Sequence, residues 1–384
     1  MPPSPDVARL SASLAGLVAI DTQNPPGNEH DAAVFVGQAL AEAGFQISFD
    51  RLAERRSNVI ARLENGTGPT FAFCTHLDVV PAGEGWAADP LQLREQDGLL
   101  YGRGACDAKG SLVAMLEALG MLAGHRSAWH GTLMGVFVCD EEIGSAGARQ
   151  FAAARRHIDH AVIGEPTNNG VIIAHKGSMR PIVRVHGRAA HSGTPDRGRN
   201  AIFDAGRLCG LIEAFHAEHL RGRQHALVGA ASLTVTRINA GTADNIVPDR
   251  CDLLLDRRMI PGENEDDVVR EIIGIIEAAA QRFDIRAEVA GYKPTTGGAA
   301  ETAPDAPIVR AALAASARHG VADPGPGGFQ GACDLVHFQN LGAAGVVIGP
   351  GSLGVAHTAN EHVPIAELVS ASLIYRDLAL AMLA

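Results

Sequence analysis

The chain has 384 residues, 46% of them hydrophobic, and a formal net charge of -11 at pH 7. This composition supplies a sizeable core, which excludes a disordered chain, and the length suits two domains. Because the net charge is negative and the sequence contains no basic run, neither nucleic acid nor an anionic membrane surface is expected as a partner.

The six cysteines lack the CxxC spacing of redox and metal-binding motifs. We expect reduced thiols, several of them buried in or beside apolar segments. The N-terminal MPPSPDVARL has neither the basic start nor the apolar middle of a signal peptide, and no apolar stretch of the sequence reaches transmembrane length. The sequence therefore predicts a soluble, cytoplasmic protein.

Residues 1–178 alternate between helical and strand patterns. Short apolar segments bounded by turn residues, namely TFAFCTH, GTLMGVFVC and HAVIGE, predict buried strands. The segment SLVAMLEALGMLA, after Gly110, is apolar almost all round and predicts a packed helix. This alternation favours an α/β sheet with helices on its faces.

Residues 179–292 follow a different pattern of alternating strands and amphipathic helices. Strands are predicted at MRPIVRVHG, ASLTVTRIN, RCDLLLDRR and IRAEVAGY, and helices at GRNAIFDAGRLCGLIEAF and NEDDVVREIIGIIEAAAQRF. Their order is βαββαβ, the split βαβ arrangement. Alternating strands imply one exposed sheet face, which suits a small separate domain that can pair with a copy of itself.

After residue 293 the first pattern returns, with helices at PIVRAALAASARHG and IAELVSASLIYRDLALAMLA and a buried strand in AAGVVIGPG. The prediction is one discontinuous α/β domain, residues 1–178 and 293–384, interrupted by an inserted domain at residues 179–292. The motif GPGSLG, residues 349–354, fits GxGxxG, the fingerprint of a dinucleotide-binding loop. Such a loop leads into a helix, and no helix begins here, so a dinucleotide site is not expected. We interpret its glycines as letting the main chain approach a site.

Histidines and carboxylates gather just past the ends of the predicted strands. They are His76 and Asp78 after strand 70–75, Glu141 and Glu142 after strand 132–139, Glu165 after strand 161–164, His357 after strand 345–348, and Asp107 in a glycine-rich loop before a helix. In open α/β sheets, ligands bind outside the carboxyl ends of the strands. We therefore expect these side chains to form one site.

Two histidines and several carboxylates, with no cysteine, suit zinc, manganese or cobalt. Two ions that share a bridging carboxylate need about five protein ligands. His76, Asp107, Glu142, Glu165 and His357 supply five. Glu141 is then free to act as a base, and Asp78 lies where a carboxylate would orient the imidazole ring of His76.

Motifs in the same order over nearly the whole chain carry a family resemblance. They are HLDVVP (76–81), GRGACDAKG (102–110), DEEIGSAG (140–147), GEPT (164–167), AHSGTPDRGRNAI (190–202), NAGTADNIVPD (239–249), DRRMIPGE (256–263) and HTANEHV (357–363). The chain thereby resembles the dinuclear zinc hydrolases that include acetylornithine deacetylase, succinyl-diaminopimelate desuccinylase, aminoacylase and the glutamate carboxypeptidases. The resemblance implies a zinc-binding catalytic α/β domain, an inserted ferredoxin-like lid and dimerisation domain, and a homodimer.

The resemblance also implies a role for each matching residue. Asp107 matches the carboxylate that bridges two zinc ions, and its peptide bond to Ala108 is expected to be cis. The other ligands are His76, Glu142, Glu165 and His357; Glu141 is the general base and Asp78 the carboxylate beside His76. In the inserted domain, His191 matches a histidine that polarises the scissile carbonyl, typically from the partner subunit. Asn245 and Arg258 match residues that hold the carboxylate of the substrate.

These observations predict a metal-dependent hydrolase that cleaves the amide bond of N-acyl amino acids. A metallo-carboxypeptidase or dipeptidase with the same dinuclear centre is the alternative. A catalytically silent binding protein is a third reading, but such a protein should have lost the base or a ligand. Cys333, before Asp334, and Thr75, before His76, depart from the family pattern, and the first leaves the acyl-group and side-chain specificity open.

Overall fold

The computed structural model describes residues 4–154 and 157–384, and the chain divides into two compact units. Unit 1 comprises Met1–Ile173, Thr302–Gly328 and Cys333–Ala384, and unit 2 comprises Ala174–Glu301 and Phe329–Ala332. The interpretation of the N-terminal segment rests partly on residues 1–3, which lie outside the described residues. The assignment of residues 1–178 with 293–384 to a catalytic domain, and of 179–292 to a lid, remains a prediction.

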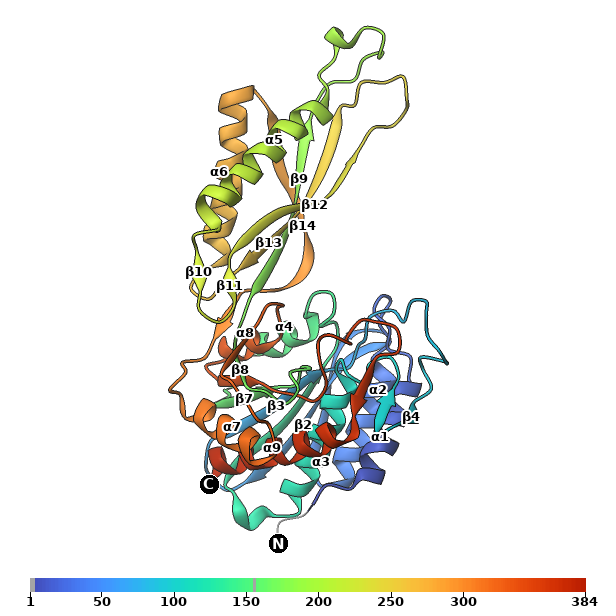
Figure 1. Ribbon diagram of the computed structural model, residues 1–384, viewed down its shortest axis with the longest axis vertical. Helices are drawn as coiled ribbons and strands as arrows, with labels where there is room; N and C mark the ends of the chain where they lie inside the picture. Colours follow the sequence, from blue (N-terminus) through green and yellow to red (C-terminus); the bar gives the residue numbers. More distant parts are fainter. Residues whose placement is uncertain (1–3, 155–156) are drawn as a thin grey trace. The chain divides into compact units, whose positions relative to one another are not determined.

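Unit 1 is built on a mixed sheet (Figure 1). Across the sheet the strands are β1 (Gln46–Ala53), β2 (Arg56–Asn65), β6 (Gly131–Val138), β3 (Thr70–His76), β7 (His160–Ile163), β17 (Ala344–Val347) and β8 (Ile172–His175). The short strands β15 (Ala300–Glu301) and β16 (Gly327–Phe329) pair with β8 at the end of the sheet, where Ala174, His175, β15 and Phe329 are assigned to unit 2. The neighbours β6, β3, β7 and β17 are mutually parallel, so their carboxyl ends share one edge.

Helices cover this sheet because its central strands are apolar throughout. All eight residues of β6 are buried, and since successive side chains point to opposite faces, both faces must be covered. The helices of unit 1 are α1 (Val7–Ala19), α2 (His30–Glu42), α3 (Lys109–Ala123), α4 (Ala146–Ala153), α7 (Pro307–Arg318), α8 (Leu335–Gln339) and α9 (Ile365–Leu383), with a 3-10 turn at Arg126–Ala128. Helices α3 and α9 pack on β3, and α8 packs on β7 and β17.

A small antiparallel sheet beside the main one joins two distant loops. It consists of β18 (His362–Pro364), β5 (Leu99–Tyr101) and β4 (Arg94–Gln96). Since His362 is opposite Tyr101, the segment after β5 lies next to the segment before β18. These two segments carry Asp107 and His357.

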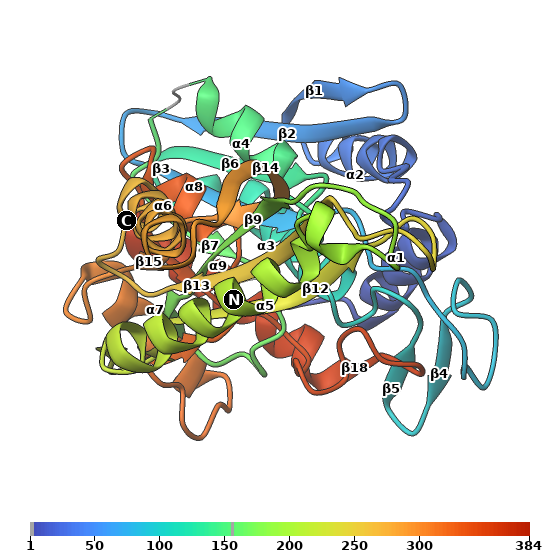
Figure 2. The ribbon, with the colours of Figure 1, turned by 90° about the horizontal axis from the view of Figure 1, so that it is seen from above.

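Unit 2 confirms the predicted βαββαβ order. Its elements are β9 (Gly177–His186), α5 (Ala201–Phe215), β12 (Ser232–Ala240), β13 (Arg250–Met259), α6 (Glu265–Phe283) and β14 (Arg286–Gly297), with short additions at Pro195–Arg197, His216–Leu220, β10 (Gln224–His225) and β11 (Gly229–Ala230). The antiparallel sheet runs β12-β13-β9-β14. Helices α5 and α6 lie side by side against it (Figures 1 and 2), and the alternate burial along β13 reflects one covered face.

Within the described residues, no helix combines the length and the apolar character needed to cross a bilayer.

Candidate metal centre

The predicted ligands reach one edge of the sheet of unit 1 because the strand register places them there. His76 is the last residue of β3 and is opposite Val138, the last residue of β6. Cys74 is opposite Ile163 of β7, so Glu165, two residues further on, comes to the level of His76. Glu141 and Glu142 follow β6 and His357 follows β17, at the same edge.

Asp107 lies between two histidine–carboxylate pairs. Its Oδ1 is 3.2 Å from Nε2 of His76, which is itself 4.0 Å from Oε2 of Glu165. Its Oδ2 is 3.3 Å from Nε2 of His357, which is 3.1 Å from Oε2 of Glu142. The two oxygens of one carboxylate therefore face two separate pairs of ligand-type atoms, the arrangement that a bridging carboxylate needs.

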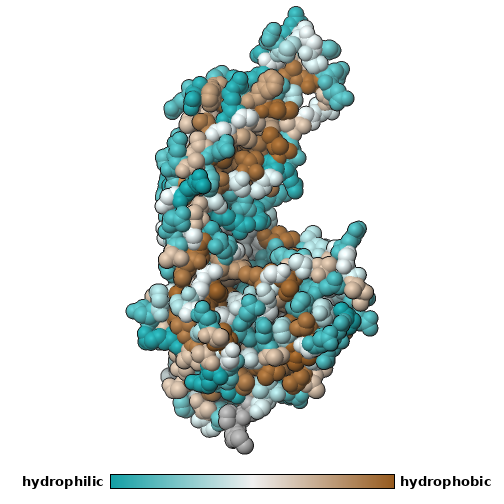
Figure 3. All heavy atoms as spheres, in the orientation of Figure 1, coloured by the Kyte–Doolittle hydropathy of each residue, from teal (hydrophilic) through white to brown (hydrophobic). Residues whose placement is uncertain are grey.

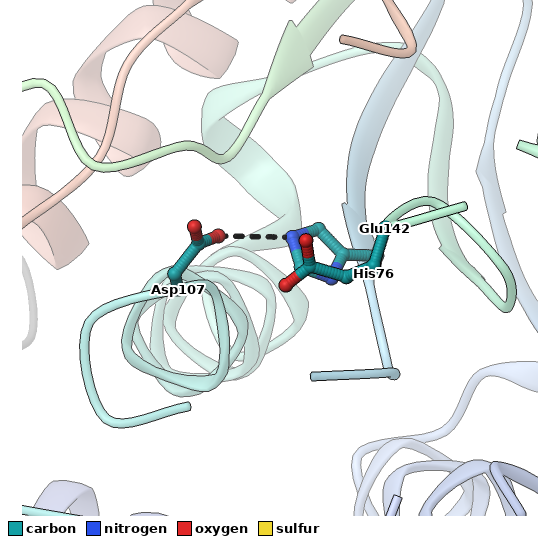
Figure 4. A group of neighbouring side chains, drawn as sticks. All are labelled: His76, Asp107 and Glu142. Atoms are coloured by element: carbon teal, nitrogen blue, oxygen red, sulfur yellow. Dashed lines mark hydrogen bonds and ion pairs between the residues drawn. The ribbon is translucent and has the colours of Figure 1, made fainter. Parts of the chain in front are cut away.

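The donor set fits a divalent metal ion. Ligand atoms of His76, Asp107 and Glu142 all lie within 4.8 Å of one another, and Figure 4 shows these side chains converging from β3 and two loops. Oε1 of Glu142 is buried without a hydrogen-bond partner, which an ion would supply. Imidazole nitrogen and carboxylate oxygen suit zinc, manganese or cobalt.

The electrostatics of the cluster favour added positive charge. Burial and the charge of Glu165 raise the pKa of Glu141 well above its ordinary value, and burial also raises the pKa of Glu142 and of Glu165. Hydrogen bonds to Asp107 and Glu142 raise the pKa of His357 to about 10. So many buried carboxylates cannot all be ionised without cations beside them, and bound metal ions would lower these carboxyl pKa values again.

The position of Asp78 and the contacts of its carboxylate differ from those predicted. Strand β3 ends at His76, so Asp78 lies in the loop beyond it, not on the same strand face. Nδ1 of His76 is 2.9 Å from the main-chain carbonyl oxygen of Asp78, whereas the nearest carboxylate oxygen is 3.8 Å away. The carboxylate instead accepts hydrogen bonds from the main-chain N–H groups of Glu141 and Glu142, at 3.1 and 3.2 Å. Asp78 thus holds the turn that carries Glu141 and Glu142.

The residues that support Asp78 were not predicted from the sequence. Nδ2 of Asn24 donates to Oδ2 of Asp78 at 2.9 Å and to Oδ1 of Asp140 at 3.1 Å. Arg56 pairs with that same oxygen of Asp140, at 2.9 Å, and with the fully buried Glu29. The available signal was the segment DTQNPPGNE, residues 21–29, whose polar side chains need partners when the segment is buried.

Two expectations about the loops are confirmed. The peptide bond between Asp107 and Ala108 is cis. At Gly349, an added Cβ would lie 2.5 Å from the main-chain oxygen of Glu165, so GPGSLG does allow a close approach of main chain to the site. Cys333 and Asp334 are buried at the start of α8, and the charge of Asp334 contributes to raising the pKa of Glu141 and of Glu165.

The three remaining predicted residues belong to unit 2. His191 is exposed in the loop between β9 and α5 and forms an isolated bridge with Ile246, while the N–H of Ser192 donates to the carbonyl oxygen of Asn245 at 2.9 Å. The structure thereby brings the His191 and Asn245 segments together. Arg258 lies on β13, and its Nε donates to Oδ1 of Asp256 at 2.7 Å.

Known proteins match this chain over nearly its full length. The family described as peptidase family M20/M25/M40 matches residues 72–381. An acetylornithine deacetylase of Myxococcus xanthus is 33% identical over 94% of both chains. A succinyl-diaminopimelate desuccinylase of Methylorubrum extorquens is 31% identical over 90% of this chain and 92% of its own.

A solved structure shares the fold. It is a dinuclear metal binding peptidase of the M20 family from Bacillus subtilis, with a TM-score of 0.73, 20% identity and coverage of 98% of both chains. These matches confirm the predicted resemblance and the predicted α/β fold class with an inserted second domain. They also confirm the prediction of an enzyme that hydrolyses amide bonds.

Proposed function

Because the chain belongs to the peptidase family M20/M25/M40, we propose that it is a metal-dependent deacylase that cleaves the amide bond of N-acyl amino acids. The observation that carries this proposal is the pair of histidine–carboxylate sets on the two oxygens of Asp107. Relatives named acetylornithine deacetylase and succinyl-diaminopimelate desuccinylase support the substrate class.

We infer that His76, Asp107 and Glu165 would hold one metal ion and that Asp107, Glu142 and His357 would hold the other. Zinc is the expected ion, with cobalt or manganese as alternatives. When bound, such ions would lower the pKa of a water molecule and polarise the amide carbonyl. The remaining steps belong to side chains of the protein.

Glu141 is the proposed general base. It takes a proton from the attacking water molecule and returns it to the leaving amine nitrogen. Its half-buried position beside the proposed ligands suits a carboxylate that must hold that proton between the two steps. Asp78 supports this role because it fixes the main chain of Glu141 and Glu142.

Residues of unit 2 are proposed to act on the substrate. His191 donates a hydrogen bond to the carbonyl oxygen as negative charge develops on it. Arg258 and Asn245 bind the α-carboxylate, for which a guanidinium group offers paired N–H donors. Since the ligands lie in unit 1 and these three residues in unit 2, turnover requires residues of both units, from one chain or from two.

A metallo-carboxypeptidase or dipeptidase is the second candidate function. It would use the same metal centre and differ only in the groups that contact the substrate. Cys333, which departs from the family pattern, is next to the buried Asp334, whose charge acts on Glu141. A changed side chain here would alter substrate choice and not metal chemistry. This departure favours keeping the peptidase as a candidate.

We further propose that the protein is a cytoplasmic homodimer and that it binds small N-acyl amino acids or short peptides. All six cysteines are free thiols, which suits a reducing compartment. In unit 2, β12 is an edge strand, and Phe203 of α5 and Ile238 of β12 are 67% and 52% exposed. Apolar residues also reach the drawn surface of this unit in Figure 3. A second copy would cover them.

Neither nucleic acid nor a membrane is a proposed partner, as the net charge of -11 disfavours both.

A panel of substrates tests the function. The chelator-treated enzyme is loaded separately with zinc, cobalt or manganese, and amine release is measured from N-acetyl, N-succinyl and N-formyl amino acids and from dipeptides. We expect acyl amino acids to have the higher kcat/KM. Faster turnover of dipeptides would establish the peptidase, and metal binding without turnover of any substrate would favour a silent binding protein.

A further inference from the structure

Glu361 is a buried carboxylate beside the metal centre that the proposed mechanism does not use. It is 0% exposed and lies in the same loop as His357. Its Oε1 accepts hydrogen bonds from the main-chain N–H groups of Cys106 and Asp107, both at 2.9 Å. Its other oxygen, Oε2, forms an ion pair with Nη1 of Arg103.

Arg103 is as thoroughly buried as Glu361. It is 1% exposed, its Nη2 donates to the carbonyl oxygen of Ala82 at 3.1 Å, and its guanidinium carbon lies 5.2 Å from the ring centroid of Trp86. A buried carboxylate without a partner is very costly, and Arg103 supplies Glu361 with a partner of opposite charge. Because both side chains are buried, this ion pair belongs to the protein interior and is not a chance surface contact.

The main chain of Glu361 strengthens the same contact. The N–H of Gly102 donates to the carbonyl oxygen of Glu361 at 3.0 Å, next to the pairing of His362 with Tyr101. The loop from Gly102 to Asp107 is therefore held at both ends by one residue. His357, four positions earlier, contacts Oδ2 of Asp107. The segment 357–361 therefore contacts Asp107 both at its main chain and at its carboxylate.

We propose that Glu361 is a positioning residue that fixes the main chain of Asp107 so that its two carboxylate oxygens face the two histidine–carboxylate pairs. Glu361 contacts neither an ion nor the substrate in this role; it acts through Asp107. The inference rests on the proposed metal centre, and it adds that the affinity and geometry of that centre depend on a carboxylate that is not a ligand.

Metal titration of two variants tests the inference. Glu361→Gln keeps the size of the side chain but leaves Arg103 without an opposite charge. The matched control is Glu117→Gln in α3: Glu117 is 4% exposed and also accepts from a main-chain N–H, that of Asp6 at 3.0 Å, and from Nε of Arg9 at 2.7 Å. Both partners of Glu117 belong to α1 or its N-cap, and neither is a proposed ligand.

The probes are zinc and cobalt ions, added to the chelator-treated full-length protein. For Glu361→Gln we expect affinity for the ions to fall about 10- to 100-fold, the cobalt absorption spectrum to change, and kcat to fall with little change in KM. For Glu117→Gln we expect a lower thermal midpoint with wild-type affinity and spectrum. Should Glu361→Gln not fold, Glu361→Asp keeps the charge, shortens the reach to both N–H groups, and is expected to show the same changes to a smaller degree.

The outcomes separate this inference from the proposed function. A wild-type protein that binds two ions, together with a Glu361→Gln or Glu361→Asp variant of unchanged affinity and cobalt spectrum, would overturn the positioning role alone. A wild-type protein that fails to bind two ions would overturn the metal centre itself. Equal loss of metal affinity in Glu117→Gln would show a general effect of lost stability and would also overturn the inference.

Discussion

Glu141 and Glu142 are adjacent in sequence but have different neighbours. Glu142 contacts Nε2 of His357 at 3.1 Å, whereas the charges of Glu165 and His76 act on Glu141. The carboxylate of Asp78 holds the main chain of both. A fixed turn can therefore present one glutamate as a ligand and the next one as a base.

The first prediction separates these two roles. Replacing Glu141 by Gln or Ala is expected to lower kcat about 100- to 10,000-fold, the usual contribution of a general base, while the metal content stays at the wild-type level. Glu142→Gln serves as the comparison and is expected to lose metal, because Glu142 is a proposed ligand. Metal analysis and steady-state kinetics measure both. Wild-type turnover by Glu141→Ala would mean that the base is another residue.

The second prediction concerns the pH dependence of stability. His175 of β8 is fully buried, and burial lowers its pKa to about 4 from the ordinary 6.5, although a hydrogen bond to the carbonyl oxygen of Lys176 opposes this. Between pH 6.5 and pH 4 the unfolded chain binds a proton that the folded chain does not. Stability therefore falls as the pH drops through this window, by on the order of 3 kcal/mol from this residue.

His175→Asn removes this titration while keeping a side-chain N–H near the carbonyl oxygen of Lys176. The thermal midpoints of the wild type and the variant are compared from pH 7.5 to pH 4.5, both with chelator, so that the ligand residues contribute equally. We expect the midpoint of the variant to fall less steeply with acidification. Parallel curves would show that His175 does not contribute.

At the scale of elements, the start of α4 packs against the end of β6 with no room for a side chain. A Cβ added at Gly147 would lie 2.5 Å from the main-chain oxygen of Cys139 and would also collide with the side chain of Asn58. Asn58 donates to the carbonyl oxygen of Gly147 at 2.9 Å and accepts from the N–H of Cys139 at 3.1 Å. This close contact closes the turn that carries Glu141 and Glu142.

The third prediction compares two glycine substitutions. Gly147→Ala is expected to destabilise unit 1 by about 1–3 kcal/mol through overpacking and to lower kcat by displacing the turn. Gly120→Ala, in α3, meets no atom within 4 Å and should stabilise the helix by about 0.5–1 kcal/mol with unchanged kcat. Thermal midpoints and kinetics test this pair. Equal effects of the two substitutions would contradict the packing argument.

For the whole molecule, the proposed roles are divided between the units: the ligands and Glu141 lie in unit 1, and His191 lies in unit 2. The fourth prediction is that His191 serves the metal centre of a partner chain. Inactive Glu141→Ala and His191→Ala chains are mixed and allowed to exchange. We expect activity to return, because a heterodimer then has one complete set of residues. Absence of recovery, with exchange demonstrated by differently tagged chains, would exclude a shared site.

The sequence by itself determined the elements with strong periodicity and the residues at their ends. The apolar segments of β3, β6, β7 and β17 and the alternating pattern of unit 2 were recognisable from local spacing. Strand β1 was not identified, because it is largely exposed and its apolar alternation is weak. The roles of the individual site residues and of the two units stay predictions.

Only the tertiary structure decided how these strand ends combine. The parallel order β6-β3-β7-β17 brings the ligand loops together, and the register sets His76 level with Glu165. The hydrogen bond between Asp78 and Glu141 joins residues 63 positions apart, and the one between Glu361 and Asp107 joins residues 254 positions apart. Periodicity describes local conformation, whereas such contacts depend on how loops from different strands pack, and no local pattern of the sequence specifies that packing.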